Sequence, residues 1–464
     1  ARDLLAWLPA VSSRKARIDL SEPGCIYTHV RRLAGGRLVF AVNVGPAAHR
    51  DVNVLIQLPD DVQGEPVVER LDLATGTAAA LPHAVVDEGE MGPTVQVQLD
   101  FAVEESHLLL VRGAPASPVP ASAPDGQRAI TGTSPTGRHE PRGPVRRRTL
   151  GRRWRFERRD PNVLVLARCA YQLEGPDGKA TEWSHPLPQP ALKRLLRRRY
   201  GWPEITFREV QPWRKYAGGP PEPVDELTRL CFRVDLAFDP SPEQQLELVV
   251  EEAAEWSVAV NGRPVSPSGD WWIDPAMQRL PVGHVLRRGE NVIELACRFR
   301  EDMSFEPVYL IGDFAVETYD MRTFRLTHEP DTLAAGSWIY QGYPFYAGRM
   351  AYRQEVELPA AGRTWLELPY LPAAAARVRI NGVYVGTLAW APLRAELTAH
   401  VRTGTNTIEI EVVNSLRNLF GPHYRFEPLA LVTPGHWFYD GTASSEMAVV
   451  PDGLPGDVYI VQER

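Results

Sequence analysis

The stretch Val258-Ala259-Val260-Asn261-Gly262 decides the fold, because the chain repeats its pattern as Val378-Arg379-Ile380-Asn381-Gly382. In both copies an alternating run leads into Asn-Gly, which predicts a strand entering a type I′ hairpin turn. Each copy then reaches a Gly-x-Asn, at Gly289-Glu290-Asn291 and Gly404-Thr405-Asn406, that opens a second apolar run. The copies lie too far apart for a solenoid repeat, so we expect each to be a whole antiparallel β domain.

The composition is that of a β-rich chain with several domains. Its 464 residues include 42 Pro and 36 Gly, which predict many turns, and 44% hydrophobic residues, which suffice for ordinary cores. Helical periodicity is clearest from Pro190 to Gly201. A formal net charge of −7 disfavours nucleic acid as a partner. No apolar run approaches the length of about 20 residues that a membrane span needs, so we expect no membrane partner either.

Three modules and a linker account for the order of the chain. Residues 1–113 read as a small β-sandwich, and residues 114–147 read as a linker rich in Pro, Ser and Arg. Residues 148–316 contain the short helix and the first copy of the repeat, and residues 317–464 contain the second copy. The arginines at the end of the linker are expected to be solvated, with a patch for an anionic polymer as the alternative.

The four cysteines are far apart and have no CxxC spacing, which disfavours structural zinc. Cys231 and Cys297 fall inside predicted strands and are expected to be buried thiols. A disulfide between them is the alternative, because strand residues of one sandwich can lie within bridging distance.

Several motifs resemble parts of large bacterial glycoside hydrolases. They are Ile26 to Arg32 with Leu38 to Asn43, Asp160 to Leu166, Val308 to Phe314, Gly342 to Gly348 and Asn414 to His423. In this order they resemble the carboxy-terminal half of α-L-rhamnosidase-like enzymes of glycoside hydrolase family 106. The second copy of the repeat is also similar to the galactose-binding-like domain of β-galactosidase and β-glucuronidase relatives.

This resemblance implies an all-β fold of three β-sandwich or jelly-roll modules, of which the second and third are galactose-binding-like. It implies that the first module follows a catalytic barrel. The barrel carries the acid and the base in that family, and nothing in this sequence corresponds to it. We therefore expect the chain to hold no catalytic residue of its own.

Carboxylates are plentiful, but their patterns do not predict catalysis. Glycoside hydrolysis needs two carboxyl groups at a set separation, and Glu251, Glu252 and Glu255 beside the first hairpin are expected to be solvated. A loop cluster comprises Glu301, Asp302, Glu306 and Asp313. We expect no cofactor and no metal ligand, with calcium at this loop cluster as the alternative, because calcium prefers several oxygen ligands from loops.

Aromatic residues in loops are the stronger candidates for carbohydrate binding, because sugar rings stack on Trp and Tyr while polar groups orient the hydroxyls. The candidates are Trp271, Trp272, Asp274, Trp390, Tyr343, Arg417, Asn418 and His423. The alternative is that these rings plug sandwich ends or seams between modules, and that the polar residues hold a loop in place.

The sequence thus predicts the accessory region of a glycoside hydrolase that acts on plant or microbial glycans. Its expected partners are carbohydrate and an upstream catalytic barrel, in the same or a separate chain. The alternatives are a free-standing carbohydrate-binding protein and an adhesion protein whose sandwiches are spacers. The sequence predicts neither the sugar nor the compartment.

Overall fold

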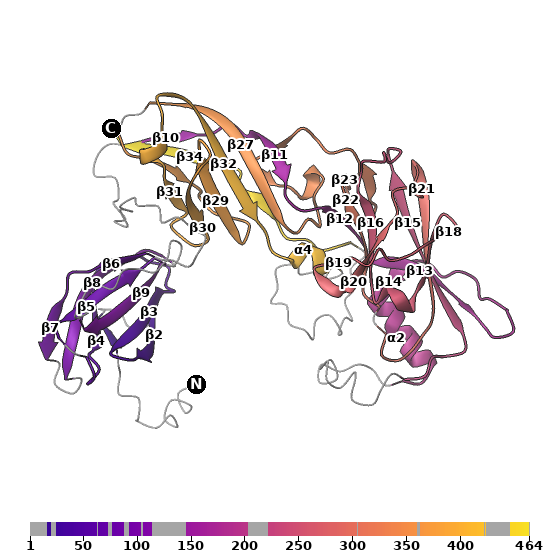
Figure 1. Ribbon diagram of the computed structural model, residues 1–464, viewed down its shortest axis with the longest axis horizontal. Helices are drawn as coiled ribbons and strands as arrows, with labels where there is room; N and C mark the ends of the chain where they lie inside the picture. Colours follow the sequence, from indigo (N-terminus) through magenta and orange to yellow (C-terminus); the bar gives the residue numbers. More distant parts are fainter. Residues whose placement is uncertain are drawn as a thin grey trace.

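Nearly all regular structure in the computed structural model is strand, so the predicted all-β fold is confirmed (Figure 1). The structure describes residues 16–19, 25–62, 64–72, 77–87, 92–103, 105–113, 145–202, 221–303, 305–359, 362–421, 423 and 446–463. The predicted linker lies outside these residues as far as position 144. Within the described ranges, no helix has the length and apolar character that crossing a membrane requires.

The first sandwich consists of two antiparallel sheets, ordered β1-β4-β8-β7 and β2-β3-β9-β5-β6. The strands are β1 (Ala16–Asp19), β2 (Ile26–Leu33), β3 (Gly36–Asn43), β4 (His49–Gln57), β5 (Pro66–Leu71), β6 (Ala78–Ala80), β7 (Ala84–Asp87), β8 (Pro93–Phe101) and β9 (Ser106–Gly113). Alternate side chains such as Val39, Val54, Val97 and Leu109 meet between the sheets and form its buried core.

The second sandwich has one sheet ordered β12-β22-β16-β20-β19 and another ordered β14-β13-β15-β21-β17-β18. The strands are β12 (Asn162–Leu166), β13 (Arg168–Glu174), β14 (Leu187–Pro188), β15 (Leu227–Leu236), β16 (Leu246–Glu251), β17 (Ser257–Val260), β18 (Arg263–Val265), β19 (Trp271–Trp272), β20 (Asp274–Pro281), β21 (Gly289–Arg298), β22 (Val308–Gly312), β23 (Ala315–Glu317) and β24 (Arg325–Thr327). The predicted helix is α2 (Gln189–Arg199), which buries Leu192 and Leu196 but leaves Leu195 exposed.

The third sandwich repeats this plan, with sheets ordered β10-β34-β28-β31 and β25-β11-β27-β32-β29-β30. The strands are β10 (Val145–Thr149), β11 (Arg153–Arg158), β25 (Thr332–Ala334), β27 (Arg349–Leu358), β28 (Thr364–Glu367), β29 (Ala375–Ile380), β30 (Val383–Leu388), β31 (Arg394–Glu396), β32 (Gly404–Val413) and β34 (Tyr459–Glu463). The short strands β26 (Gly336–Ser337) and β33 (Gly453–Leu454) pair with each other, and the helix α4 (Arg417–Phe420) follows β32.

The second sandwich is inserted into the third. β10 pairs with β34 and β11 pairs with β27, so residues 145–158 belong to the third sandwich. The chain then builds the second sandwich from β12 to β24 and returns at β25. This pairing corrects the predicted boundaries, which placed residues 145–147 in the linker and 148–158 in the second module. Pairing between distant ends of a chain leaves no local sequence pattern, so the sequence could not show it.

A buried arginine ties the two connections of the inserted sandwich together. Arg158, at the end of β11, donates hydrogen bonds to Glu329 on the returning connection and to Asp313, the latter at 3.2 Å. The hydroxyl of Tyr343 also donates to Glu329, at 2.8 Å. The side chain of Arg158 is only 8% exposed, so this charge is held by a full set of acceptors, as a buried guanidinium requires.

Both Asn-Gly dipeptides form the predicted hairpin turns. β17 and β18 close around Asn261-Gly262, and β29 and β30 close around Asn381-Gly382. The φ angles are 52° and 73° in the first turn and 51° and 81° in the second, as a type I′ turn requires. In each sheet the hairpin lies next to the long strand that begins at Gly-x-Asn, so the two dipeptides occupy equivalent connections.

A pair of asparagines fixes each hairpin to that long strand. Asn261 Nδ2 donates to Asn291 Oδ1 at 2.8 Å, and Asn381 Nδ2 donates to Asn406 Oδ1 at 2.9 Å. Asn291 and Asn406 are both fully buried, and each donates to two backbone carbonyls. The repeat is therefore duplicated down to its side-chain hydrogen bonds.

All four cysteines are free thiols. Thr228 pairs with Cys297 and Cys231 pairs with Glu294, so the side chains of Cys231 and Cys297 point to opposite faces of their sheet. The alternative of a disulfide between these two residues is therefore wrong. Burial raises the pKa of the Cys297 thiol to about 12, which makes it an inert apolar group.

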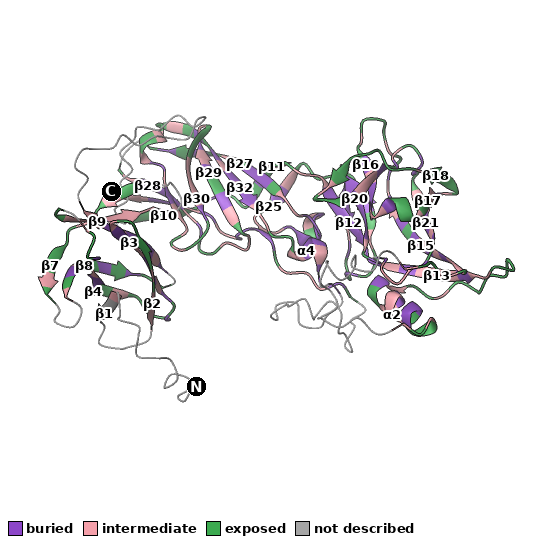
Figure 2. Ribbon diagram, turned by 60° about the horizontal axis from the view of Figure 1, so that its bottom comes forward, coloured by how far each residue is buried: buried purple, intermediate pink, exposed green. Residues whose placement is uncertain are grey.

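The core of the second sandwich continues into the third. Ile339, Phe345, Leu419 and Met447, all from the third, belong to the buried cluster of the second. The strands β12 and β22 are buried at every position, and Figure 2 shows the purple ribbon of β12. These two strands are thus covered by the partner sheet on one face and by the third sandwich on the other, which explains their uninterrupted apolar sequences.

Candidate functional site

The hairpin formed by β19 and β20 carries three of the predicted site residues. Trp271 pairs with Gln278 and Trp272 pairs with Asp274, so Ile273 alone forms the turn. Ile273 has a φ of 50° and is exposed. A β-branched side chain is strained in this left-handed conformation, at a cost on the order of 1–3 kcal/mol. The tip of this hairpin is therefore not optimised for stability.

The two tryptophans of the hairpin have different environments. Trp272 is half-buried, and its ring lies 5.8 Å from that of Tyr309, which in turn lies 6.2 Å from the ring of Phe420 in α4. Trp271 is 54% exposed. Trp272 thus anchors the hairpin at the seam between the two sandwiches, where α4 lies beside β19 and β20 (Figure 1), and Trp271 presents its ring to solvent.

Gln278 and Asp274 are the cross-strand partners of the two tryptophans. Gln278 is the cross-strand neighbour of Trp271, so their side chains share one face of the hairpin. Its Oε1 is buried and has no hydrogen-bond partner among the described residues. Asp274 is exposed and uses Oδ1 to accept the backbone N–H of Ala276 at 2.9 Å. The site therefore combines a flat apolar ring with groups that accept hydrogen bonds.

The other predicted aromatics do not join this site. Trp390 is 44% exposed in the loop between β30 and β31 of the third sandwich. Tyr343 is fully buried beside Arg158, and burial raises the pKa of its hydroxyl. Tyr343 therefore stabilises the junction and cannot be a binding platform, which corrects its predicted role.

The polar candidates after β32 form a buried cluster of hydrogen-bonded side chains around Asp452. Asn418 Nδ2 donates to the carbonyl of Val450 at 2.8 Å and to Asp452 Oδ2 at 3.0 Å, and Asn414 Nδ2 donates to the same oxygen at 3.2 Å. His423 Nε2 lies 2.9 Å from the carbonyl oxygen of Asn418. Burial raises the pKa of Asp452 to about 6, and burial lowers the pKa of His423 to about 4.

This cluster favours the alternative that the polar residues after β32 hold their loop in place. Asn418 and His423 are buried and bonded to the chain itself, so neither is placed to meet a ligand. Arg417 is half-buried at the start of α4. Asp452 was missed by sequence reasoning, because no residue pattern marks a lone carboxylate that receives two asparagine side chains from a distant segment.

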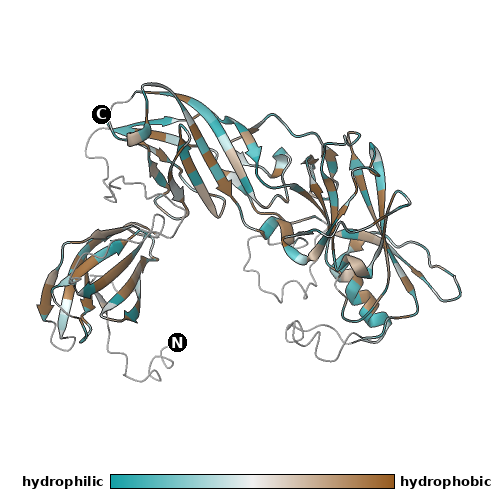
Figure 3. Ribbon diagram, viewed as in Figure 1, coloured by the Kyte–Doolittle hydropathy of each residue, from teal (hydrophilic) through white to brown (hydrophobic). Residues whose placement is uncertain are grey.

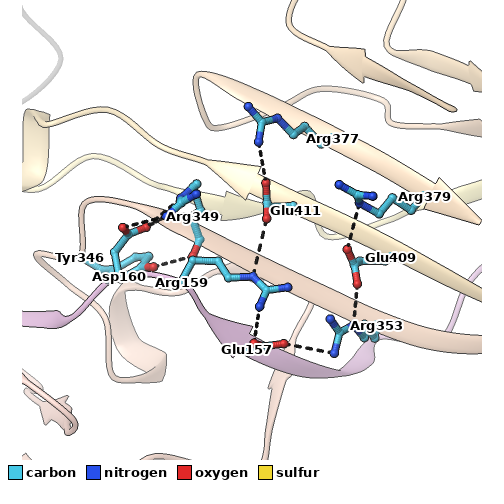
Figure 4. Close-up of polar contacts among 10 residues, drawn as sticks. All are labelled: Glu157, Arg159, Asp160, Tyr346, Arg349, Arg353, Arg377, Arg379, Glu409 and Glu411. Carbon is cyan, nitrogen blue, oxygen red and sulfur yellow. Dashed lines mark hydrogen bonds and ion pairs between the residues drawn. The ribbon is translucent and has the colours of Figure 1, made fainter. Parts of the chain in front are cut away.

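The densest charge cluster covers the outer face of the wide sheet of the third sandwich (Figure 4). Arg353 bridges Glu157 and Glu409, and Arg377 and Arg159 both contact Glu411. Further ion pairs join Arg379 to Glu409 and Arg349 to Asp160. The sequence signal for this lattice is the period-two spacing of charges in the strands, such as Glu409-x-Glu411.

The lattice neutralises its own carboxylates. Each acid in it contacts at least one guanidinium. Of the loop carboxylates considered for calcium, Glu301 pairs with Arg197, Asp302 pairs with Arg300 and Asp313 pairs with Arg158. Among the described residues, no group of three or more His, Cys, Asp or Glu side chains could hold a metal ion.

No protein-family model and no curated protein sequence matches the chain. Solved structures do match. The rhamnosidase from Novosphingobium sp. PP1Y is similar over 100% of this chain and 26% of its own, at 15% identity and a TM-score of 0.36. The α-L-rhamnosidase from Streptomyces avermitilis, complexed with L-rhamnose, is similar over 96% of this chain and 39% of its own, at 14% identity and a TM-score of 0.22. A β-glucuronidase from Ruminococcus gnavus matches over 32% of this chain and 27% of its own, at 13% identity and a TM-score of 0.19.

The structures that this chain resembles are thus glycoside hydrolases, at low identity and low TM-score. The chain spans 26% and 39% of the length of the two rhamnosidases.

Proposed function

We propose that the chain is the accessory region of a glycoside hydrolase, in which β-sandwich modules bind carbohydrate beside an α-L-rhamnosidase-like catalytic barrel. The observation that carries the proposal is the exposed ring of Trp271 on a strained hairpin that also presents the exposed carboxylate of Asp274. The order of motifs from Ile26 to His423, which resembles the carboxy-terminal half of family 106 enzymes, supports the same function.

The chemistry of the hairpin suits a sugar. The C–H face of a pyranose stacks on an indole ring, and its hydroxyls donate to acceptors at the ring edge. The carboxylate of Asp274, which pairs with Trp272 in the same hairpin, is exposed and can accept such hydrogen bonds. Trp272 holds the platform rigid through Tyr309, so little side-chain entropy is lost when a ligand stacks on Trp271.

Titration with saccharides tests this proposal. The chain is titrated with rhamnose, galactose and uronic-acid oligosaccharides by calorimetry, and Trp271→Ala is compared with wild type. Loss of the stacking ring should weaken binding by roughly 10- to 100-fold, or about 1–3 kcal/mol. Tyr370→Ala, which removes an exposed ring from the third sandwich, is the matched control. If wild type binds no saccharide in the panel, the carbohydrate role is refuted.

The same proposal holds that the chain alone hydrolyses no glycoside. The carboxylates of the lattice are held by arginines, and Asp452, whose pKa is raised, is buried and bonded to Asn414 and Asn418. Assays on aryl-glycosides, rhamnosides included, should give no turnover. Turnover that a single Glu or Asp substitution abolishes would contradict this expectation. A catalytic barrel encoded upstream in the same gene would distinguish an accessory region from a free-standing binding protein.

A further inference from the structure

One sheet of the first sandwich has an apolar outer face. β3 contains Leu38-Val39-Phe40-Ala41-Val42 and β9 contains Leu108-Leu109-Leu110-Val111, which are apolar at every position. Val39, Ala41, Leu109 and Val111 point into the core. The alternate residues are half-buried and belong to none of the three cores of described residues; they are Leu38, Phe40, Val42, Leu108 and Leu110. Figure 3 shows the hydrophobic stretches along these strands.

A strand that is apolar on both sides is typical of a sheet covered on both faces. The strands β12 and β22 show the same continuous pattern, and there the third sandwich covers the second face. For β3 and β9 the buried core covers only one face. The third sandwich shows the opposite case, because the outer face of its wide sheet carries the Arg–Glu lattice. The first sandwich therefore presents a face built for a partner.

The strand register arranges this outer face in rows that cross the sheet. One row runs Arg31, Leu38, Leu110, Glu69 from β2 through β3 and β9 to β5. The neighbouring row runs His29, Phe40, Leu108, Leu71. The first row is basic at one edge, apolar in the middle and acidic at the other edge. Such a row is complementary to itself after a half-turn.

We propose that a second copy of the chain covers this face. A two-fold axis parallel to the strands, between β3 and β9, would place Leu38 over Leu110 of the partner subunit. The same operation would place Arg31 over Glu69 of the partner subunit, once on each side of the axis. This is an isologous interface, in which each contact occurs twice. Two sheets stacked face to face lie about 10 Å apart, which suits interdigitated Leu and Phe side chains.

The acidic edge of the row can accept this second arginine. Arg112 Nε and Nη2 both bind Glu69 Oε2, at 3.0 and 2.9 Å. A carboxylate has a second oxygen, which can receive Arg31 of the partner subunit without loss of the existing pair. Arg31 itself is exposed in the strand β2. The charges at the rim would select the register, and the apolar centre would supply the affinity.

Sedimentation velocity on the whole chain tests the proposal. The monomer has a mass of 51.8 kDa, and we expect a species of twice that mass at micromolar concentration. Leu38→Glu and Leu110→Lys should each raise the dimer dissociation constant by roughly 30-fold or more, because each removes a central anchor. Arg31→Glu, at an exposed position, should raise it by roughly 10-fold. Val383→Glu, at an exposed apolar residue of β30, is the matched control and should leave the dimer intact.

Mixing the two central variants tests the register itself. In a mixed dimer, the carboxylate introduced by Leu38→Glu on one subunit meets the ammonium introduced by Leu110→Lys on the other, so neither charge is buried alone. The second central contact of that dimer stays apolar. Equal amounts of the two variants should therefore form a dimer that neither forms alone.

Three outcomes would overturn the proposal. A wild-type chain that stays monomeric at 100-fold higher concentration would leave the face to another protein. A dimer that survives both single variants would show that the interface lies elsewhere on the chain. A mixture of the two variants that stays monomeric would contradict the two-fold register.

Discussion

The second and third sandwiches share one internal hydrogen-bonded motif and differ in what surrounds it. In both, an Asn-Gly hairpin is locked to the next strand by a buried asparagine, through hydrogen bonds that match atom for atom. Around that motif, the strands β12 and β22 of the second sandwich are buried at every position, whereas the sheet of the third sandwich that contains β27 and β32 carries a charged outer face. The repeated residues thus specify the fold, and the residues between them specify what each sandwich contacts.

Replacing the buried asparagines Asn291 and Asn406 should have the largest effect on the free energy of unfolding. Asn406→Ala removes a fully buried side chain that makes several hydrogen bonds and leaves backbone carbonyls without donors. We expect each of Asn406→Ala and Asn291→Ala to lower the free energy of unfolding by about 3 kcal/mol. Urea denaturation measures this change.

Asparagine-to-aspartate variants at the same positions sharpen the test, because aspartate keeps the shape and the acceptor but loses the donors. Similar losses at both positions would confirm that the two locks are equivalent. A large loss at only one of them would show that the asparagine of the other sandwich has no such structural role.

The hairpin of β19 and β20 in the second sandwich should give the next largest effect on the free energy of unfolding. Trp272→Ala removes the ring that packs on Tyr309, so we expect a loss of about 2 kcal/mol in the free energy of unfolding. Trp271→Ala, at a largely exposed ring, should change stability by less than about 0.5 kcal/mol. Thermal melts of the two variants measure the difference. Equal losses would mean that both rings are plugs and that the platform does not exist.

The buried cluster around Asp452 in the third sandwich should make the free energy of unfolding depend on pH. Burial raises the pKa of Asp452 to about 6, above its unfolded value of 3.8. The protonated form is thus favoured in the folded state, and the stability that it contributes is lost as pH rises through 6. The advantage of Asp452→Asn over wild type at pH 7.5 should therefore shrink by about 1.5 kcal/mol at pH 5.

His423 acts in the opposite direction in the same region. Burial lowers the pKa of His423 to about 4, so the stability that its neutral form contributes is present above pH 6.5 and falls as the pH drops. This contribution is common to wild type and Asp452→Asn, and it cancels when their unfolding free energies are subtracted. A difference between the two proteins that does not vary from pH 5 to 7.5 would contradict the raised pKa of Asp452.

The charged lattice should give the smallest effect. Glu409→Gln removes the acid that bridges Arg353 and Arg379 on the surface of the third sandwich. Surface ion pairs contribute little in water, so we expect a loss of about 0.5–1 kcal/mol that disappears in high salt. Glu355→Gln, at an exposed position of the same sheet, is the control. A loss larger than that of the asparagine variants would mean that the lattice, and not the buried lock, stabilises the third sandwich.

Much of the fold could be predicted from local sequence patterns. The two Asn-Gly turns, the helix near residue 190 and the all-β class were predictable, because a turn type and a period of side chains depend on adjacent residues. The candidate site was predicted in part. Trp271, Trp272 and Asp274 were found from composition, but their division into one exposed ring and one anchor was not. Tyr343 was misjudged, since its buried partner Arg158 is far away in the sequence.

The sequence by itself determined that this chain is an array of β-sandwiches, with two copies of one hairpin. Only the tertiary structure decided that the second sandwich is inserted into the third, that Asn418 and His423 are buried around Asp452, and which strand faces are covered. The physical reason is the separation in sequence of the residues that interact. Turn geometry and side-chain alternation are set within a few residues, whereas burial of a polar group or a sheet face depends on which distant segment packs against it.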